Sequence, residues 1–387
     1  MTSPAPTTTR ELPLALAPDV ALPISIDDPR LDTPAVLVDL DIVEHNIARA
    51  AGHAARNGLS LRPHIKTHKS AVMARRQLDA GATGVCVSTA SEALVMARVG
   101  IRDITVAYPL VGQAKLDRVA LALAAGAEIC LTTDSDWATV GYGELATRVG
   151  LPLRVLVEVD TGMHRSGARP ELVVERAARV AKTAGLQFAG ILTHAGHAHD
   201  VPGPRDIAQV AHQEATILGN LRSDLEAAGL PCPIVSAGST LTAPHLSADQ
   251  GVTELRPGTY IYNDLRTLAC FSCTPDAIAA TVLTTVASQD GPRLTVDAGS
   301  KTLTSSQDPT YGYGHPVGAP GAMFTRLSEE HGVLTDLEHQ LDAGVGDRLQ
   351  ILPIHVCVWM DLQPEVYGVR RGQVVERITV DAMRHSL

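Results

Sequence analysis

The residues best suited to chemistry in this sequence surround one lysine, Lys66, in the segment "LRPHIKTHKS" (61–70). His64, Thr67 and His68 lie next to it, and a short apolar stretch leads into the segment. A lysine held beside other cationic groups and partly removed from water loses its proton more easily and can form a Schiff base with a carbonyl. A lone lysine at the end of a strand more often extends into solvent. The clustered histidines and a separate anion site favour the interpretation of Lys66 as a nucleophile.

A run of small residues, "SAGST" (236–240), is typical of such an anion site. Gly238, Ser239 and Thr240 would let backbone N–H groups and hydroxyls converge on a phosphate. Gly-Ser turns are common, so the run gains its weight from its place after the seventh predicted strand of a barrel. A reactive lysine combined with a phosphate site suggests pyridoxal phosphate, which is held at both of its ends in this way.

Two further segments carry candidate residues. Arg165 in "DTGMHRSG" (160–167) would donate to the phenolic oxygen of the cofactor or to a substrate carboxylate, although a surface arginine that caps a loop fits the sequence equally well.

In "PIHVCVW" (353–359), His355 and Cys357 are two residues apart and would point the same way on a strand. An imidazole and a thiolate on one face form half of a zinc-type site. The alternative is a buried histidine and a buried cysteine without a metal. Two protein ligands would leave positions open for water or substrate, so the metal would be catalytic.

The elements that must position these residues alternate between β-rich and alanine-rich helical stretches. The predicted strands are 59–65, 83–89, 103–109, 127–133, 153–160, 188–196, 233–240 and 254–263, and the clearest helices are 91–100, 113–126, 169–185 and 213–229. Strands that alternate with helices predict an α/β fold of parallel βαβ units, and eight units match a (β/α)8 TIM barrel. A doubly wound open sheet would call for a Gly-rich turn after the first strand, and "RPHIKTHKS" has no glycine.

Residues beyond 270 are β-rich and separated by Gly, Pro and Asp, which predicts a second, C-terminal all-β domain. We predict a flexible N-terminal arm over 1–22, a cofactor-binding barrel over 36–268, and a β domain that combines 23–35 with 269–387 and carries the metal site. The candidate residues would then meet at the carboxyl ends of the barrel strands.

The composition narrows the class of protein. The chain of 387 residues has 32 Lys and Arg against 42 Asp and Glu, a net charge of −10 that argues against a nucleic-acid partner. Its six cysteines are scattered, unlike those of a small disulfide scaffold. No basic start precedes an apolar stretch, and no segment approaches the length of a membrane span. We therefore expect a cytoplasmic enzyme without a membrane partner.

Several motifs together resemble the D-serine dehydratase and D-threonine aldolase group of alanine-racemase-like, fold-type III pyridoxal-phosphate enzymes. They are "RPHIKTHKS", "DTGMHRSG", "GILTHAGHAHD", "SAGSTLT", "ELRPGTYIYNDL", "VDAGSKTLTSS", "SEEHG" and "ILPIHVC", and they run in the family's order from about residue 30 to 380. The resemblance implies that Lys66 is the cofactor lysine and that Ser239 and Thr240 hold the phosphate, with the backbone near Gly238 and with Tyr262. It also implies cofactor contacts from His64, Arg165 and His194, where His194 stands in place of a tyrosine found in some members.

By the same resemblance, His355 and Cys357 bind a divalent metal, zinc first, with manganese or magnesium as alternatives. The His-x-Cys spacing is more similar to the dehydratases than to the aldolases, in which His-x-Asp is typical. We therefore predict a lyase that eliminates water from a D-β-hydroxy amino acid, giving a 2-oxo acid and ammonia, with Lys66 as the base and Arg165 beside the substrate. Retro-aldol cleavage to glycine and an aldehyde is the main alternative. An amino-acid racemase, a non-catalytic pyridoxal-phosphate protein and a cofactor-free lysine aldolase also stay open. Members of this fold type commonly form homodimers with their sites at the subunit interface.

Overall fold

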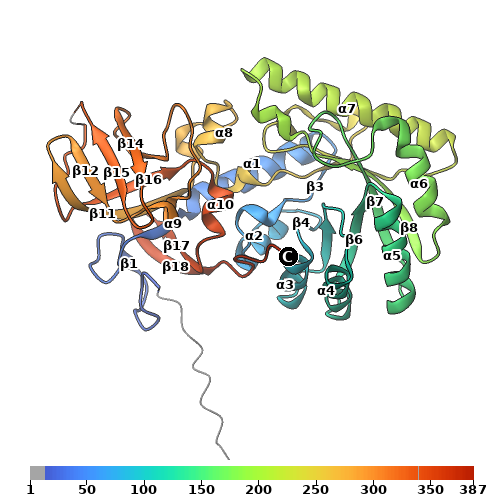
Figure 1. The fold of residues 1–387 in the computed structure, drawn as a ribbon, viewed down its shortest axis with the longest axis horizontal. Coiled ribbons are helices and arrows are strands. Elements are labelled where there is room, and N and C mark those ends of the chain that lie inside the picture. Colours follow the sequence, from blue (N-terminus) through green and yellow to red (C-terminus); the bar gives the residue numbers. More distant parts are fainter. Residues whose placement is uncertain (1–13, 339) are drawn as a thin grey trace, which may run out of the picture.

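The computed structural model describes residues 14–338 and 340–387, which form two domains that lie side by side (Figure 1). One domain is a barrel of parallel strands surrounded by helices, and the other is built of mainly antiparallel strands. The helix α1 (Leu40–Arg56) runs from the β domain into the barrel. The predicted fold class, a TIM barrel followed by a β domain, is confirmed.

Each of the eight predicted barrel segments contains a parallel strand. The strands are β3 (Ser60–Leu61), β4 (Val85–Val87), β5 (Asp103–Val106), β6 (Glu128–Thr133), β7 (Leu153–Val159), β8 (Leu186–Thr193), β9 (Ile234–Ala237) and β10 (Glu254–Leu255). Their order is β3-β10-β9-β8-β7-β6-β5-β4. The ring closes between β4 and the chain after β3, where Cys86 N–H donates to Pro63 O at 2.8 Å.

The first and last barrel strands are shorter than predicted, and proline explains both. β3 ends at Leu61, two residues before Pro63, and β10 ends at Leu255, two residues before Pro257. Proline has no N–H to donate to a sheet, so regular pairing stops close to it. The chain that follows β3 is therefore free to turn into the 3₁₀ helix Ile65–Thr67, which carries Lys66.

The helices cover the outside of the barrel. They are α1, α2 (Ala71–Asp79), α3 (Ala90–Arg98), α4 (Gln113–Ala124), α5 (Asp136–Val149), α6 (Val173–Lys182), α7 (Pro204–Ala227) and the short α8 (Leu265–Ala269). The four stretches predicted as helices correspond to α3, α4, α6 and α7, and α7 begins earlier than predicted because Pro204 suits the first turn of a helix.

The β domain contains ten strands and two short helices. They are β1 (Ile24–Ser25), β2 (Ala35–Asp39), β11 (Ala280–Asp290), β12 (Arg293–Val296), α9 (Ser300–Leu303), β13 (Gly314–Pro316), β14 (Ala322–Leu327), β15 (Gly332–Asp336), β16 (Arg348–Pro353), α10 (Val356–Met360), β17 (Glu365–Arg370) and β18 (Gln373–Thr379). β2 pairs with β11 and β17, so the boundary predicted at residue 36 falls inside a strand of this domain. The chain leaves the domain at Asp39, whose carboxylate accepts from Asp41 N–H at 2.9 Å and caps α1.

The predicted N-terminal arm is partly packed. Residues 1–13 of it lie outside the described residues. Leu16 is completely buried in a cluster with Leu31 and Val374, and its N–H donates to Tyr367 Oη at 2.9 Å. Residues 14–22 therefore belong to the β domain, because the apolar side chains of the arm find a partner surface there.

The prediction that His355 and Cys357 lie on a strand is wrong. β16 ends at Pro353, His355 is the residue before α10, and Cys357 is in its first turn. Pro353 offers no N–H to a neighbouring strand, and Val356 N–H donates to the carboxylate of Asp264 at 3.1 Å, which starts the helix.

The barrel interior contains a buried charge network. The Arg62 guanidinium donates to Glu254 at 2.7 Å and to Asp103 at 2.9 Å. The side chains of Arg62 and Glu254 are only 6% and 7% exposed. Ser236 Oγ also donates to Glu254, at 2.5 Å, and Arg256 donates to the same hydroxyl. This network ties strands β3, β5, β9 and the chain after β10 together beneath the carboxyl end of the barrel.

We expect Arg62→Met to lower the free energy of unfolding by about 3–5 kcal/mol, because it leaves the Glu254 carboxylate buried without its cation. The matched control is Arg148→Met, which removes an ion pair with Asp117 whose side chains are 44% and 49% exposed. That change should cost less than about 1 kcal/mol. Urea unfolding followed by fluorescence and circular dichroism measures both. Equal losses in the two variants would contradict the role given to the interior network.

Candidate active site

A cavity of about 510 Å³ lies at the carboxyl ends of the barrel strands, where the β domain faces the barrel. Eight of the residues predicted from the sequence line it: His64, Lys66, Arg165, His194, Ser239, Thr240, His355 and Cys357. They come from the loops after β3, β7, β8 and β9 and from α10, which are far apart in the chain. The structure thus brings the candidate lysine, the candidate anion loop and the candidate metal pair into one space.

The lysine segment touches the metal segment directly. Thr67 Oγ1 lies 3.2 Å from Cys357 Sγ, and Thr259 Oγ1 lies 3.7 Å from the same sulfur. Lys66 precedes Thr67 in the 3₁₀ helix after β3. The residue before that helix, His64, accepts the Lys66 N–H on its Nδ1 at 3.3 Å. The neutral imidazole therefore carries its proton on Nε2.

A second lysine of the same segment joins the barrel to the metal helix. Lys69 Nζ lies 2.6 Å from the Asp361 carboxylate, which follows α10, and 3.3 Å from Glu92 of α3. Glu92 also accepts Ser88 N–H at 2.6 Å, and Ser88 lines the cavity. The Lys69 and Glu92 side chains are 8% and 1% exposed, and the Asp361 side chain is 27% exposed, so the triad is buried on the Glu92 side. It fixes the end of α10 against the loop that carries Lys66.

Asp264 holds the other end of α10. One of its oxygens accepts Thr267 N–H at 2.8 Å and caps α8, and the other accepts Val356 N–H at 3.1 Å. Burial raises the pKa of Asp264, and burial lowers the pKa of the neighbouring His355 imidazole, although the Asp264 carboxylate opposes that second shift. His355 is therefore neutral at physiological pH, which is the form that binds a metal.

The anion loop is built as the sequence suggested, with one difference. Ser239 N–H donates to Thr242 Oγ1 at 2.9 Å, and Ser239 Oγ accepts Thr242 N–H at 3.2 Å, so the loop is closed on itself. Gly238 supports the loop from behind, with a φ of +84° and its N–H on Glu214, but it does not line the cavity. In the part of the chain that the structure describes, the N–H groups of Thr240 and Gly258 have no acceptor.

Gly258 lines the cavity where the chain after β10 closely approaches the lysine segment. A Cβ placed there would lie 3.1 Å from His64 O and 3.2 Å from Thr67 Oγ1. The absence of a side chain lets the chain after β10 pack closely against the lysine segment. Tyr262, in contrast, does not line the cavity. It is buried, and the edge of its ring packs on His68 with ring centres 6.4 Å apart.

The electrostatics of the cavity favour an anionic ligand. Burial lowers the pKa of His64 and of His194 well below the ordinary value, and the nearby Lys66 cation lowers both further. Burial also raises the pKa of the Glu158 carboxyl. Among the described residues, the Lys66 amine and the Arg165 guanidinium form no salt bridge, and both residues line the cavity.

Several residues that line the cavity were not singled out from the sequence, among them Glu158, His199, Asp264 and Arg266. Glu158 is inside an apolar strand, β7, where no turn or motif marks it. Asp264 and Arg266 follow "YIYN". The local signal there was Asp264 itself, because Asp is a preferred N-cap residue and Asp264 begins the short helix α8. Their role in the cavity depends on long-range packing against α10, which no local pattern reveals.

These residues fit the cofactor and the metal that the family uses. The unsatisfied N–H groups of Thr240 and Gly258 and the Ser239 and Thr240 hydroxyls suit a phosphate, and Lys66 reaches the same cavity. His355 and Cys357 supply an imidazole and a sulfur, the donors that zinc prefers. Within residues 14–338 and 340–387, no group of three or more His, Cys, Asp or Glu side chains could hold a metal. A metal here would keep positions for water or substrate.

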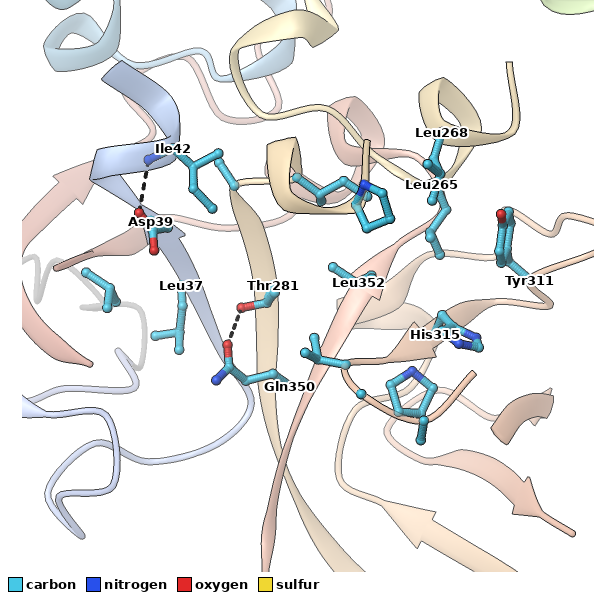
Figure 2. Close-up of a pocket in the computed structure, with 18 of the residues that line it drawn as sticks. Leu37, Asp39, Ile42, Leu265, Leu268, Thr281, Tyr311, His315, Gln350 and Leu352 are labelled. Carbon is cyan, nitrogen blue, oxygen red and sulfur yellow. Dashed lines mark hydrogen bonds between the residues drawn. The ribbon is translucent and has the colours of Figure 1, made fainter. Parts of the chain in front are cut away.

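A second cavity, of about 530 Å³, lies behind α8 and is lined mainly by apolar side chains (Figure 2). Leu265 and Leu268 of α8 point into it, together with Leu37 and Leu352 of the β domain. Its carboxylate, Asp39, already caps α1. The short helix α8 thus separates an apolar space from the polar cavity that contains Lys66, and the chemistry belongs to the polar cavity.

Comparison with known proteins agrees with the fold. Residues 38–265 match the family described as "Alanine racemase, N-terminal domain", and residues 279–369 match the "Putative serine dehydratase domain". D-threo-3-hydroxyaspartate dehydratase of Delftia sp. (strain HT23) is 34% identical, over 84% of this chain and 91% of that protein.

Two solved structures are similar over nearly the whole fold. The crystal structure of D-threonine aldolase from Filomicrobium marinum is 31% identical, with a TM-score of 0.86 over 92% of this chain and 97% of that chain. A mutant of the D-threo-3-hydroxyaspartate dehydratase in its metal-free form is 32% identical, with a TM-score of 0.82 over 90% of this chain and 97% of that chain.

The fold and the site define an alanine-racemase-like protein with a barrel and a β domain. Within that class, the chain belongs to the D-serine dehydratase and D-threonine aldolase family. No helix in the described part of the chain is long and apolar enough to cross a membrane.

The stability of the site region should depend on pH through His68. Its Nδ1 accepts Ser70 N–H at 3.1 Å and its Nε2 lies 3.1 Å from Gln77 Oε1, so the neutral imidazole is fully bonded. Burial lowers the pKa of His68 from 6.5 to about 4. Between these two values the unfolded chain binds a proton that the folded chain does not. The free energy of unfolding should therefore fall as the pH is lowered from about 6.5 towards 4.

We expect His68→Gln to reduce this slope by up to about 1.4 kcal/mol per pH unit, since one titrating group is lost. Urea unfolding at several pH values between 7.5 and 4.5 measures the slope. His212→Gln, at an exposed position, is the control and should keep the slope of the parent protein. A His68→Gln slope equal to that of the parent would show that His68 is protonated in the folded state.

Proposed function

We propose that this protein is a pyridoxal-phosphate- and metal-dependent lyase that removes water from D-β-hydroxy amino acids, giving a 2-oxo acid and ammonia. The observation that supports it most directly is the contact between Thr67 Oγ1 and Cys357 Sγ, at 3.2 Å. Through it, the lysine that would hold the cofactor and the pair that would hold the metal share one cavity. The names of the relatives, a dehydratase and an aldolase, agree with a lyase.

The residues that line the cavity would have different roles in this reaction. Lys66 would bind the cofactor and, once released by substrate, would take the proton from Cα with its amine. Ser239 and Thr240 would hold the phosphate, and Arg165 would bind the substrate carboxylate. His64 and His194, neutral in this cavity, would orient the cofactor without adding charge. Bound pyridoxal phosphate would supply an electron sink for Cα, and a divalent ion on His355 and Cys357 would supply a Lewis acid for the β-hydroxyl.

Retro-aldol cleavage to glycine and an aldehyde is the second candidate, supported by the similarity to a D-threonine aldolase. It would use the same cavity, with a base that removes the proton of the hydroxyl. Cys357 is our reason for preferring dehydration, because the His-x-Cys spacing is more similar to the dehydratases than to the aldolases, in which His-x-Asp is typical. Glu158 lines the cavity, where one of its carboxylate oxygens already accepts a hydrogen bond from Ser166 Oγ at 2.9 Å.

A product assay separates the two reactions. We expect the metal-replete holoenzyme to release a 2-oxo acid and ammonia from D-serine or 3-hydroxy-D-aspartate, with little glycine. Lys66→Ala should lose this activity by at least about a thousandfold, since both cofactor attachment and the base are removed. Lys115→Ala, on the outside of the barrel in α4, is the control and should behave as the parent protein. Glycine with an aldehyde as the main products would favour the aldolase. The absence of both sets of products would contradict a lyase.

Metal removal tests the proposed metal site at His355 and Cys357. Treatment with a chelator should abolish turnover, and added Zn²⁺, Mn²⁺ or Mg²⁺ should restore it to different extents and thereby identify the ion. Cys357→Asp should weaken zinc binding and lower dehydratase activity at least tenfold, because a hard oxygen replaces a soft sulfur. His212→Gln is a matched control outside the cavity. Full dehydratase activity in Cys357→Asp would undo the use of Cys357 to choose between the reactions.

We also propose that the chain works in the cytoplasm as a homodimer with its sites at the interface. Two aromatic side chains support a partner surface on the barrel: Tyr108, which lines the cavity, is 48% exposed, and Trp137 of α5 is 76% exposed. Large exposed aromatic side chains are enriched at interfaces. Sedimentation of the parent protein and of Trp137→Glu would report the state of assembly.

A further inference from the structure

We propose that Thr67 and Thr259 are positioning residues whose hydroxyls donate hydrogen bonds to the Cys357 sulfur when it binds a metal, and that they set the affinity and the Lewis acidity of that metal. This inference rests on the proposed function, because it takes His355 and Cys357 as the metal ligands. The observations that carry it are the approach of two hydroxyls to one sulfur, their lack of other partners, and the close packing at Gly258 that holds them there.

Two hydroxyls of the barrel approach the sulfur from different loops. Thr67 Oγ1 lies 3.2 Å and Thr259 Oγ1 lies 3.7 Å from Cys357 Sγ. The threonines belong to the 3₁₀ helices Ile65–Thr67 and Thr259–Ile261, which follow the first and the last barrel strand, whereas Cys357 is in α10 of the β domain. Among the residues that the structure describes, neither hydroxyl has another hydrogen-bond partner. Both hydroxyls are therefore available to the sulfur.

Packing holds the two threonines in this position. Thr67 is completely buried, so its hydroxyl cannot turn to water instead. Ile65, at the start of the same 3₁₀ helix, is also completely buried and belongs to the barrel core. A Cβ at Gly258 would lie only 3.2 Å from Thr67 Oγ1, so a side chain there would push the hydroxyl away. Because Thr259 follows Gly258 directly, the same close approach brings the second hydroxyl towards the sulfur.

Metal binding determines the direction of these hydrogen bonds. A free thiol can donate to a hydroxyl or accept from it, but a metal is bound by the thiolate, which has no proton and only accepts. Thr67 and Thr259 would then both donate to a buried negative sulfur, which stabilises the thiolate and favours metal binding. The same hydrogen bonds withdraw electron density from the sulfur, so the metal stays a stronger Lewis acid. Loss of a β-hydroxyl as hydroxide depends on that property.

The test reads the sulfur itself, in holoenzyme that carries Co²⁺ in place of its own metal. A thiolate bound to Co²⁺ gives a charge-transfer band in the near ultraviolet, and a hydrogen bond to the sulfur raises the energy of that band. The band should therefore move to longer wavelength in T67V and, by less, in T259V, because the second hydroxyl is farther from the sulfur. Zinc affinity, measured by competition with a chromogenic chelator, should fall about tenfold in T67V.

Two further variants separate the hydroxyl from packing. T67S keeps the hydroxyl and should retain the band position and the zinc affinity of the parent protein. T139V is the matched control, because it removes a buried hydroxyl of α5 that bonds Ser135 O at 2.9 Å, away from the cavity. It should leave both readouts unchanged.

The possible results distinguish this inference from the proposed function. A parent protein with the thiolate band, together with T67V and T259V that keep its wavelength and zinc affinity, would overturn the inference and leave the metal site standing. T67S as strongly altered as T67V would also overturn it, since the packing of the methyl group and not the hydroxyl would then matter. A parent protein that binds Co²⁺ without a thiolate band would contradict Cys357 as a ligand and, with it, the proposed function.

Discussion

The structure depends on the junction between the segment after the first barrel strand and the helix α10 of the β domain. Two contacts join that segment to the helix and its end, Thr67 with Cys357 and Lys69 with Asp361, and Asp264, which follows the last barrel strand, holds the start of the helix by accepting Val356 N–H. Each of them joins residues about 90 to 290 positions apart in the chain. A site split between two domains works only if their relative position is fixed, because a displacement of about 1 Å is enough to spoil reactive geometry. The buried ion pair of Lys69 is well suited to this, since it is directional and costly to break.

The barrel and the β domain could be predicted from the sequence because their signals are local. The alternation of β-rich and alanine-rich stretches determined the eight strands, and Gly- and Pro-separated β-rich segments marked the second domain. The local signals failed where a residue far away in the chain determines the local structure. The carboxylate of Asp264 and the proline at 353 turn the predicted strand of His355 and Cys357 into a cap and a helix. Leu16 is packed only because Tyr367 and Val374 meet it.

The candidate site, like the fold, was predicted where the signal is local and missed where it depends on distant contacts. Motif position was sufficient to bring six predicted residues to one cavity, because the carboxyl ends of parallel strands meet at one face, whereas packing of the β domain brings His355 and Cys357 there. Sequence could not place Tyr262, which is buried against His68 and away from the cavity, and it could not single out Glu158 or Arg266. These residues owe their setting to burial and to neighbours from other elements. The same burial keeps the cavity histidines neutral and leaves the cations of the cavity to dominate its charge.

The central claim is that one cavity of one chain holds the cofactor on Lys66 and the metal on His355 and Cys357. A crystal structure of the holoenzyme, with anomalous diffraction recorded at the zinc edge, tests it directly. The account predicts continuous density from Lys66 Nζ to a pyridoxal group and an anomalous peak bonded to His355 and Cys357 in the same cavity. A peak bound elsewhere, or a cofactor held by another lysine, would contradict it.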